Sequence, residues 1–349
     1  GGVHDQIGGG FHRYSTDGQW IVPHFEKMLY DNAGLLSNYV HAWQLTGLPL
    51  FRETAEGILA WADEVLSDRA HGGFYTSQDA DVGLEDDGDY FTWTLDELKK
   101  ALPAEEARVL ALRYDVGEKG EMHHDPERNV LHVTAAPEDI AAGLTLPLEQ
   151  VTALLTRGKA RLKAARDRRT APAIDRTIYA SWNAMMISAA LEAAMAFGRD
   201  DVRAFALRSL DRLWNRLWTQ DAGVWHALAG RKRKVHGLVE DHIFLADALL
   251  AAQTATGDSA WLRRAEEVMA YALKHFWDAD HPGFTDLADE VRAKAELSLR
   301  EIPRRPVEDS PYAGANAVAA LCLERLHALT GNDDYRLHHD EIMMSFAGE

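Results

Sequence analysis

The sequence is short of cysteine, of positive charge and of long apolar runs. Cys322 is the only cysteine among 349 residues, which excludes an intrachain disulfide and is typical of a protein of the cytoplasm. No apolar run reaches about 18 residues, so the sequence predicts no membrane-spanning helix and no membrane partner. The 37 basic residues against 55 acidic ones leave a formal charge of −18. Such a chain repels phosphate backbones, which disfavours a nucleic-acid partner.

Several catalytic motifs are also missing. The sequence contains no Gly-rich phosphate loop, no paired CxxC motif and no GxSxG nucleophile motif. The runs His123-His124-Asp125 and His338-His339-Asp340 resemble metal ligands, but neither has a partner motif and both are interpreted as polar surface. We therefore expect no metal and no cofactor. The composition is that of a globular protein, and without a Pro/Ser-rich linker we expect one domain over residues 1–349.

What the sequence does contain is a repeat. Four glycines stand at the ends of helix-like runs, and a polar residue precedes each of them by fifteen positions. The pairs are Asn32 with Gly47, Asn183 with Gly198, His242 with Gly257, and Asn316 with Gly331. After the first three, a second glycine followed by an apolar residue comes 25 or 26 positions later, in Gly73-Phe74, Gly223-Val224 and Gly283-Phe284. Each unit therefore predicts a helix, a Gly stop, a second helix and a short turn.

The two helices of a unit differ in their apolar faces. The second carries one apolar stripe opposite charged residues, as over residues 202–217, and so predicts a helix with one exposed face. The first is apolar nearly all round, because residues 182–197 hold a single charge, Glu192, and residues 313–323 hold none. Alternating buried and half-exposed helices favour an all-α toroid of helical hairpins. Its rival is an open α-solenoid, whose units usually keep a constant length.

The repeat predicts where the helices lie. We expect inner helices near residues 27–45, 182–197, 240–255 and 313–329, and outer helices near residues 50–67, 201–218, 259–276 and from 333 onward. Residues 74–181 form the largest insert. Strand-like pieces and helices near residues 95–102 and 147–166 predict one further, less regular hairpin there.

The phase of the repeat predicts a site. Equivalent positions lie at the same end of a ring, so the polar segments that lead into the inner helices should surround one pocket. Asp175, Glu240-Asp241 and Glu308-Asp309 belong to such segments, and residues 8–32 are the richest in ionisable side chains. The alternative, without a binding role, is that residues 8–32 form a Gly-rich turn and the start of a helix, where the polar side chains cap the backbone.

The candidate catalytic residues suit proton transfer or hydrolysis: His24, Glu26, Asp79, Asp241 and His242. The candidate substrate-binding residues are His12, Arg13, Trp20, Lys27, Asp31, Asn32, Asp81, Trp93, Asp175, Trp182, Asn183, Asp309 and Asn316. Flat Trp rings can stack on sugar faces, although the Trp residues equally suit core packing. Asp79 and Asp81 equally suit a solvated turn. We expect His24, Glu26, Asp79 and Asp241 to converge on one cavity, with Arg13 and Trp20 at its wall.

Two long motifs stand in the first 33 residues: Gly8-Gly-Gly-Phe-His-Arg-Tyr-Ser15 and Trp20-x-Val-Pro-His-Phe-Glu-Lys-Met-Leu-Tyr-Asp-Asn-Ala33. Shorter motifs follow in order at Asp79–Asp81, Phe91–Thr94, Ser181–Asn183, Glu240–Asp241 and Gly314–Val318. Together they resemble the spermatogenesis-associated protein 20 family, whose bacterial members include YyaL.

The resemblance implies a six-hairpin-glycosidase-like (α/α)6 domain, also seen in N-acylglucosamine and cellobiose 2-epimerases, which follows a thioredoxin-like domain. We expect this chain to be a fragment that lacks the thioredoxin-like domain and the first hairpins. Its ring would then be incomplete, and the open edge would expose apolar inner-helix surface that favours association.

The sequence departs from the family pattern at three places. It reads Pro172-Ala-Ile-Asp-Arg-Thr177 where Pro-His-x-Asp-Asp-Lys is usual, and Asp241-His242 where Asp-Tyr is usual. It also reads Tyr312-Ala-Gly-Ala-Asn316 where Pro-Ser-Gly-Asn is usual. If these positions contact a ligand, the ligand or activity of this chain has drifted from that of the family.

Three hypotheses compete for the function. The first is a carbohydrate-active enzyme, either a sugar epimerase or isomerase with His24 and His242 as the acid/base pair, or a glycoside hydrolase. The hydrolase would draw its two carboxylates from Glu26, Asp79 and Asp241. The second is a non-catalytic module that presents a ligand or client to a thioredoxin-like domain, and the third is a structural scaffold. The expected partner is a small molecule, for the enzyme a sugar.

Overall fold

The computed structural model describes residues 1–83, 86–293 and 304–347. The chain divides into two compact units, which are described one at a time. The hairpin unit consists of Leu29–Ala55, Ser67–Thr76 and Arg176–Glu349. The insert unit consists of Gly1–Met28, Glu56–Leu66 and Ser77–Asp175.

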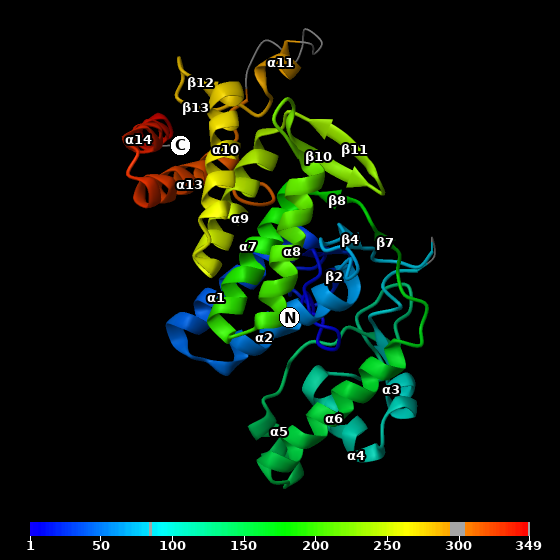
Figure 1. The fold of residues 1–349 in the computed structure, drawn as a ribbon. Helices are drawn as coiled ribbons and strands as arrows, with labels where there is room; N and C mark the ends of the chain where they lie inside the picture. The colour runs from blue at the N-terminus through cyan, green and yellow to red at the C-terminus, as the bar shows by residue number, and fades with distance from the viewer. Residues whose placement is uncertain (84–85, 294–303, 348–349) are drawn as a thin grey trace. The chain divides into compact units, whose positions relative to one another are not determined.

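Four inner helices form the centre of the hairpin unit: α1 (Leu29–Thr46), α7 (Ala180–Phe197), α9 (Val239–Thr256) and α13 (Ala315–Thr330). Neighbours in this order pack against each other (Figure 1). The outer helices α8 (Asp200–Leu217), α10 (Ser259–Phe276) and α14 (Asp333–Ser345) pack on α7, α9 and α13 in turn. These bounds confirm the predicted inner and outer helices to within a few residues, apart from the first outer helix. In that one, α2 (Pro49–Trp61) continues into the π-helical turn η1 (Ala62–Leu66).

Local chemistry explains why these helices begin and end where they do. Gly198, Gly257 and Gly331 take left-handed φ values of 69°, 71° and 72° after the last turns of α7, α9 and α13, as predicted for helix-ending glycines. The apolar inner helices need partners for their few polar groups. In α7 the single charged residue, Glu192, accepts a 2.6 Å hydrogen bond from the Ser37 hydroxyl of α1.

Three of the four marker residues of the repeat make the same kind of hydrogen bond. Oδ1 of Asn183 accepts the backbone N–H of Phe74 at 2.7 Å, and Oδ1 of Asn316 accepts that of Phe284 at 2.7 Å. Nε2 of His242 accepts the backbone N–H of Val224 at 2.9 Å. Each of these three markers therefore ties the entrance of an inner helix to the turn that follows an earlier hairpin. The repeat read from spacing alone corresponds to one repeated hydrogen bond.

A small sheet accompanies the helices of the hairpin unit. Its strands are β8 (Ile178–Tyr179), β9 (Trp218–Thr219), β10 (Gly223–Ala229) and β11 (Lys232–His236). The order β11-β10-β8 leaves β11 at an edge, and all pairs are antiparallel. Short elements complete the unit: β12 (Trp277–Asp278), β13 (Gly283–Phe284) and α11 (Asp289–Arg292).

The insert unit has more helices than the single irregular hairpin that the sequence predicts. It contains α3 (Leu95–Ala101), α4 (Ala104–Tyr114), α5 (Pro137–Leu144) and α6 (Leu148–Arg166) around a core that includes Leu98, Leu110 and Leu162. Its strands are the two-residue pieces β1 (Tyr14–Ser15), β2 (Pro23–His24), β3 (Lys27–Met28), β4 (Ser77–Gln78), β5 (Trp93–Thr94), β6 (Arg128–Asn129) and β7 (Ile174–Asp175). The sequence patterns do not predict α4 and α5, which are 11 and 8 residues long and lie in the insert, outside the repeat.

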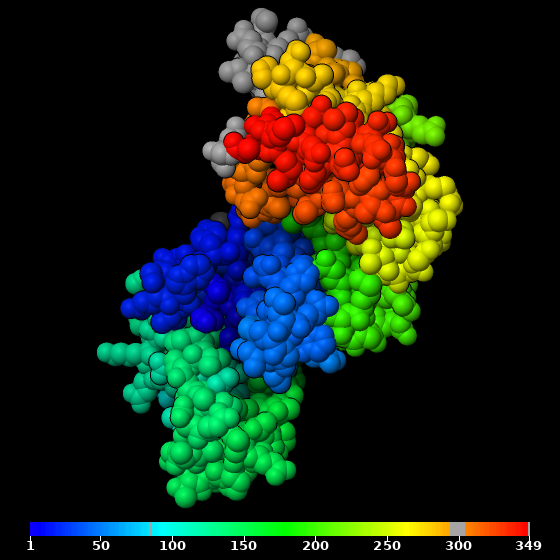
Figure 2. Space-filling model, turned by 90° about the vertical axis from the view of Figure 1, so that its left-hand side faces the viewer, coloured from blue at the N-terminus to red at the C-terminus, as the bar shows by residue number. Residues whose placement is uncertain are grey.

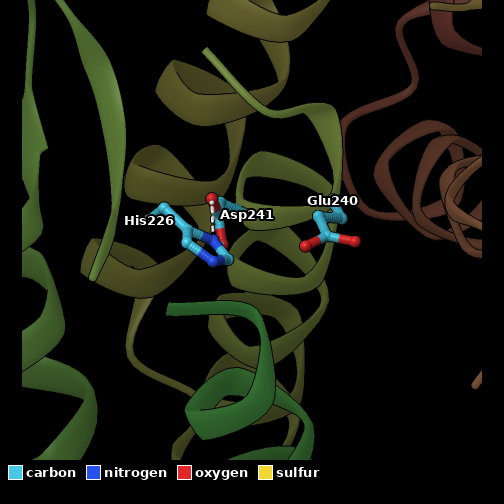
Figure 3. A group of neighbouring side chains, drawn as sticks. All are labelled: His226, Glu240 and Asp241. Atoms are coloured by element: carbon cyan, nitrogen blue, oxygen red, sulfur yellow. Dashed lines mark hydrogen bonds and ion pairs between the residues drawn. The ribbon is translucent and has the colours of Figure 1, made fainter. Parts of the chain in front are cut away.

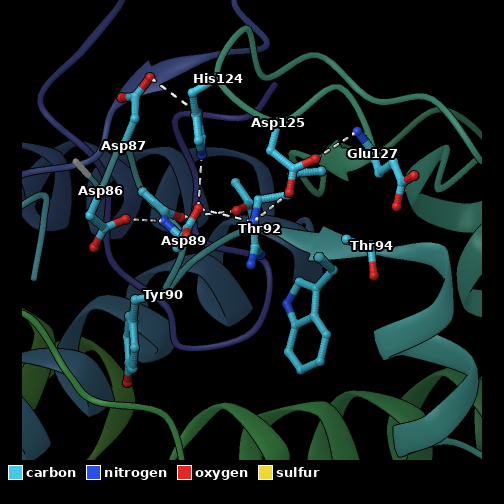
Figure 4. A network of polar contacts seen from close by, with 12 residues as sticks. Asp86, Asp87, Asp89, Tyr90, Thr92, Thr94, His124, Asp125 and Glu127 are labelled. Atoms are coloured by element: carbon cyan, nitrogen blue, oxygen red, sulfur yellow. Dashed lines mark hydrogen bonds and ion pairs between the residues drawn. The ribbon is translucent and has the colours of Figure 1, made fainter.

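Polar contacts organise the loops of the insert unit. Nε2 of His124 lies 2.9 Å from Asp89, and Nε of Arg128 lies 3.0 Å from the same carboxylate (Figure 4). This network matches the interpretation of the His123-His124-Asp125 run as polar surface. None of the helices within the described residues is long and apolar enough to cross a membrane.

Candidate functional site

A cluster of acidic, imidazole and aromatic side chains lies at the amino ends of the inner helices of the hairpin unit. Glu240 and Asp241 belong to the first turn of α9, and His226 comes from the middle of β10. In Figure 3 the imidazole of His226 faces the carboxylate of Asp241, and the carboxylate of Glu240 lies beside this pair. One potential ligand atom from each of the three residues lies within 4.8 Å of those of the others.

Asp241 orients His226. The carboxylate of Asp241 is fully buried and accepts the N–H of His226 Nδ1 at 2.9 Å and the backbone N–H of Ser181 at 3.2 Å. Burial lowers the pKa of His226, but the hydrogen bond and the negative charge of Asp241 outweigh it, so the pKa is raised above 6.5. With Nδ1–H held by Asp241, Nε2 is the ring nitrogen of His226 that this pairing leaves for other partners.

Glu240 has a different hydrogen-bond partner from its neighbour Asp241. The hydroxyl of Tyr312 donates to its Oε2 at 2.9 Å, and Nε1 of Trp182 donates to the Tyr312 oxygen at 3.4 Å. Burial and the nearby charge of Asp241 raise the pKa of Glu240, while the hydrogen bond from Tyr312 opposes the rise. A carboxyl with a raised pKa is better suited to proton transfer near neutral pH than an ordinary surface glutamate.

Aromatic rings surround these groups. The ring of Trp182 lies 4.7 Å from that of Tyr30 and 4.8 Å from that of Tyr179, and Tyr179 also lies 4.8 Å from His226. Tyr312 packs against Tyr30 at 5.5 Å and against Phe244 at 5.7 Å. Flat faces beside hydrogen-bonding groups are typical of sites that bind sugars.

A cavity of about 270 Å³ opens beside Glu240 and Tyr312. Three carboxylates line it, those of Glu240, Asp286 and Glu308, together with Phe244 and Arg304. Burial raises the pKa of Asp286 as well. The cavity therefore combines apolar walls with several hydrogen-bonding groups, which is the usual make-up of a small-molecule site.

The side chains of His226, Glu240 and Asp241 are spaced so that a metal ion could be held among them. However, the imidazole N–H of His226 already donates to Asp241, so two of the three would-be ligands are paired with each other. The pairing makes a proton-transfer dyad the simpler description of this cluster.

Of the residues predicted from the sequence, the hairpin unit brings Asp241 and Trp182 to this cluster. Asn183 and Asn316 instead serve the repeated hydrogen bonds to Phe74 and Phe284. Asn32 is fully buried and Asp31 half-buried in the first turn of α1. Asp309 is exposed, and its carboxylate accepts the backbone N–H of Gly314 at 3.0 Å.

His242 does not fit the catalytic role expected of it. It is fully buried, its Nε2 accepts the N–H of Val224, and its Nδ1 lies 2.9 Å from the carbonyl oxygen of Leu238. Its ring stacks on Tyr271 with centroids 5.1 Å apart. Burial lowers the pKa of His242 to about 4, which keeps the ring neutral. Both nitrogens are thus used by the backbone, as in the asparagines at the equivalent positions.

The residues predicted near the amino terminus lie in the insert unit. His24 is half-buried in β2 and its ring stacks on Tyr14 at 5.0 Å. Nδ1 of His24 is buried and finds no hydrogen-bond partner among the described residues. Glu26 and Arg13 form a 3.4 Å ion pair. Trp20 is 61% exposed, with a left-handed φ of 62°.

Three predicted ligand-binding residues are parts of the insert-unit core. Nζ of Lys27 is buried and donates to Asp5 at 2.6 Å, and burial lowers the pKa of Lys27 to about 8. His12 is buried with Nδ1 2.7 Å from the carbonyl oxygen of Phe25, and burial lowers its pKa to about 3. Trp93 is 2% exposed with Arg169 stacked over its ring at 3.9 Å. Packing explains these three side chains, so the expectation that they bind substrate does not fit their surroundings.

The remaining predicted acids sit in turns and at a strand end of the insert unit. Asp79 is exposed, and its carboxylate accepts the N–H of Ala80 at 2.8 Å. Asp81 accepts the N–H of Gly88 at 3.2 Å, and burial raises the pKa of Asp81. Asp175 is exposed at the end of β7. These contacts match the solvated-turn alternative for Asp79 and Asp81.

Sequence reasoning missed His226, and it assigned no catalytic role to Glu240 or Tyr312. A signal for His226 was present in the repeat, because it stands three positions after Gly223. Asp286, which lines the cavity beside Glu240, stands three positions after Gly283. The repeat phase, applied to the second glycine of each unit, would have identified both.

Comparisons with known proteins show what this chain is similar to. The family described as N-acylglucosamine 2-epimerase matches residues 160–290. Spermatogenesis-associated protein 20 of Homo sapiens is 33% identical over 96% of this chain and 46% of that protein, and its Mus musculus counterpart is 34% identical over 96% and 45%. The chain therefore spans about half the length of these curated relatives.

Two solved structures resemble this chain in fold. A sugar epimerase from a ruminal bacterium matches with a TM-score of 0.52 and 11% identity over 99% of this chain and 82% of that one. Cellobiose 2-epimerase from Spirochaeta thermophila DSM 6192 matches with a TM-score of 0.52 and 13% identity over 98% and 79%. At these identities the likeness concerns the fold alone. It confirms the predicted class, an all-α (α/α)6 toroid of helical hairpins.

Proposed function

This chain is a relative of spermatogenesis-associated protein 20, similar to it along 96% of its residues, and we propose that its hairpin unit is a sugar isomerase or epimerase. The observation that supports this most directly is the His226–Asp241 dyad beside Glu240, whose carboxylate is linked through Tyr312 to Trp182. Glu240 and Tyr312 line the cavity, and His226 offers a ring nitrogen within 4.8 Å of Glu240, so an acid and a base stand at or next to a small-molecule pocket.

Glu240 acts as the base and His226 as the acid in this proposal. The ionised Glu240 removes the proton from the carbon next to the carbonyl of an open-chain sugar. The protonated ring of His226 gives its proton to the carbonyl oxygen, so that an enediol forms. Return of the carbon-bound proton to the neighbouring carbon, with loss of a hydroxyl proton to His226, completes an aldose–ketose exchange. Asp241 positions His226 and stabilises its charged form.

The spacing of the groups favours isomerisation over epimerisation. Because Glu240 and His226 offer atoms within 4.8 Å of each other, they approach a bound sugar from the same side. Moving a proton between adjacent carbons of the sugar needs acid/base groups on only one face of the sugar. Inverting the configuration of one carbon needs a proton donor on the opposite face as well. The residue that would provide that second face is not among these three.

The surroundings of Asp241 disfavour a hydrolase built on Glu240 and Asp241. Retaining and inverting glycosidases both use two carboxylates that flank the scissile bond. Asp241 is fully buried, and its carboxylate accepts the N–H of His226 and the backbone N–H of Ser181.

Exchange of carbon-bound hydrogen with solvent tests this proposal whichever sugar is the substrate. The purified protein is incubated in D2O with uncharged aldoses and ketoses, because the three carboxylates of the cavity repel acidic sugars. We expect deuterium to enter next to the carbonyl of at least one sugar. Glu240→Gln and His226→Gln should slow this exchange by about 10²–10⁴-fold, the usual contribution of a general acid or base.

The matched control is His71→Gln. His71 also pairs with an aspartate, Asp68, at 3.0 Å, but it is exposed and does not line the cavity. This variant should exchange like the wild type. Suppose that a sugar binds, that Glu240→Gln or His226→Gln weakens its binding, and that no deuterium exchange occurs. The hairpin unit would then be a ligand-binding module that works with another part of a longer protein, and the enzyme proposal would be wrong. No binding and no exchange across the panel would refute both.

A further inference from the structure

The hairpin unit has a second hollow, which shares no lining residue with the cavity beside Glu240. It measures about 590 Å³ and collects four arginines from three parts of the chain. Arg212 and Arg216 lie on α8, Arg231 lies in the turn between β10 and β11, and Arg176 precedes β8. In a chain with a formal charge of −18, so many guanidinium groups around one hollow call for an explanation.

The acidic side chain at this hollow, that of Asp68, already has ionic partners. Asp68 is its only carboxylate among the described residues, and it pairs with Arg212 at 2.8 Å and with His71 at 3.0 Å. Within the part of the chain that the structure describes, Arg176, Arg216 and Arg231 take part in no ion pair. Three positive charges therefore face the hollow uncompensated.

The scaffold holds these arginines in place. Arg212 and Arg216 are four residues apart on α8, which puts them on the same face of the helix. The backbone of Arg231 is tied to α8, because the guanidinium of Arg216 donates to its carbonyl at 3.5 Å. Nε of Arg233 donates to the carbonyl of Arg216 at 2.6 Å. Arg176 lies over the ring of Tyr75, 5.7 Å from its centroid.

We propose that this arginine hollow, lined by Arg176, Arg212, Arg216 and Arg231, binds the phosphoryl group of a small ligand. Like charges gathered on a fixed scaffold repel each other, and an anion with several acceptor oxygens relieves that repulsion. A guanidinium fork matches two oxygens of a phosphoryl group at once, which a lysine cannot do. The volume suits a small molecule, since ligand pockets usually measure about 300–1,000 Å³.

Calorimetric titration with pyrophosphate and with glucose 6-phosphate tests the proposal. We expect either compound to bind the wild type, and binding to weaken as salt rises because exposed charges are screened. Arg176→Gln combined with Arg231→Gln should weaken binding at least tenfold. Both side chains are exposed, so the variant should fold, and its melting temperature and circular dichroism check this.

The matched control is Arg336→Gln, which removes an exposed arginine of α14 outside the hollow and should bind like the wild type. Glucose serves as the uncharged control for glucose 6-phosphate. Absence of binding to the wild type would overturn the proposal, as would binding that the double variant leaves unchanged. If an oligoglutamate peptide binds and neither phosphoryl compound does, the hollow recognises an acidic peptide instead, and the assignment to a phosphoryl group is wrong.

Discussion

Asp241 is the residue on which most of the candidate site depends. Its buried carboxylate receives the imidazole of His226 and the backbone N–H of Ser181, so it ties β10 to the amino ends of α7 and α9. A buried charge is costly unless such partners surround it. The same carboxylate raises the pKa of His226 and of Glu240. One side chain thereby couples the fold of this region to its acid/base chemistry.

Asp241→Asn should lower the pKa of His226, because the charge of Asp241 is lost and the smaller effect of the Glu240 charge is left to oppose burial. NMR titration of the imidazole protons of His226 measures this. In the wild type, the raised pKa means that the dyad stabilises the fold below about pH 6.5. That contribution is lost as the pH rises through the folded-state value. An unchanged His226 titration in Asp241→Asn would show that Asp241 does not set this pKa.

At the scale of elements, the same kind of hydrogen bond joins successive hairpins at three places. Asn183, His242 and Asn316 each reach from the first turn of an inner helix to the backbone after a glycine. The glycine is needed at these turns. A Cβ on Gly223 would lie 2.2 Å from Nε2 of His242, and the φ of Gly223 is 67°. Histidine and asparagine are interchangeable in this role because both present an acceptor at a similar reach.

His242→Ala should lower the free energy of unfolding by about 1–3 kcal/mol, because the buried N–H of Val224 loses its acceptor. The cavity left beside Tyr271 should lower the stability further. His242→Asn should lose less, because asparagine makes the equivalent hydrogen bond in the neighbouring repeats. Urea denaturation of both variants measures the difference. Equal losses would mean that ring packing, and not the repeated hydrogen bond, is what His242 provides.

At the scale of the whole molecule, the outer surface of the last helical hairpin is apolar. Leu321 of α13 is 64% exposed, and Leu337 and Met344 of α14 are 57% and 71% exposed. Figure 2 shows α13 and α14, in orange and red, on the face toward the viewer. Leu321 lies on α13, which is an inner helix. Its exposure agrees with the expectation of an incomplete ring, which stays a prediction.

We expect this chain to associate as its concentration rises, through α13 and α14. Sedimentation velocity over a range of concentrations measures this. Leu321→Glu combined with Met344→Glu should shift the distribution toward monomer, since exposed positions tolerate a charge and the apolar contact is lost. Arg336→Glu, on the same hairpin, is a control for added negative charge. A wild type that remains monomeric at every concentration would contradict the prediction.

The sequence alone determined the helices of the hairpin unit and their order, because helix periodicity and Gly stops are local and recur at a fixed spacing. It also placed Asp241 and Trp182 near a site through the phase of the repeat. Only the tertiary structure decided which side chains meet. His226 reaches Asp241 from a strand that forms by long-range pairing, and Tyr312 reaches Glu240 across 72 positions. The arginine hollow likewise joins Arg176, Arg216 and Arg231, which no local pattern connects. Side-chain encounters depend on how the elements pack, and spacing along the chain does not encode that packing.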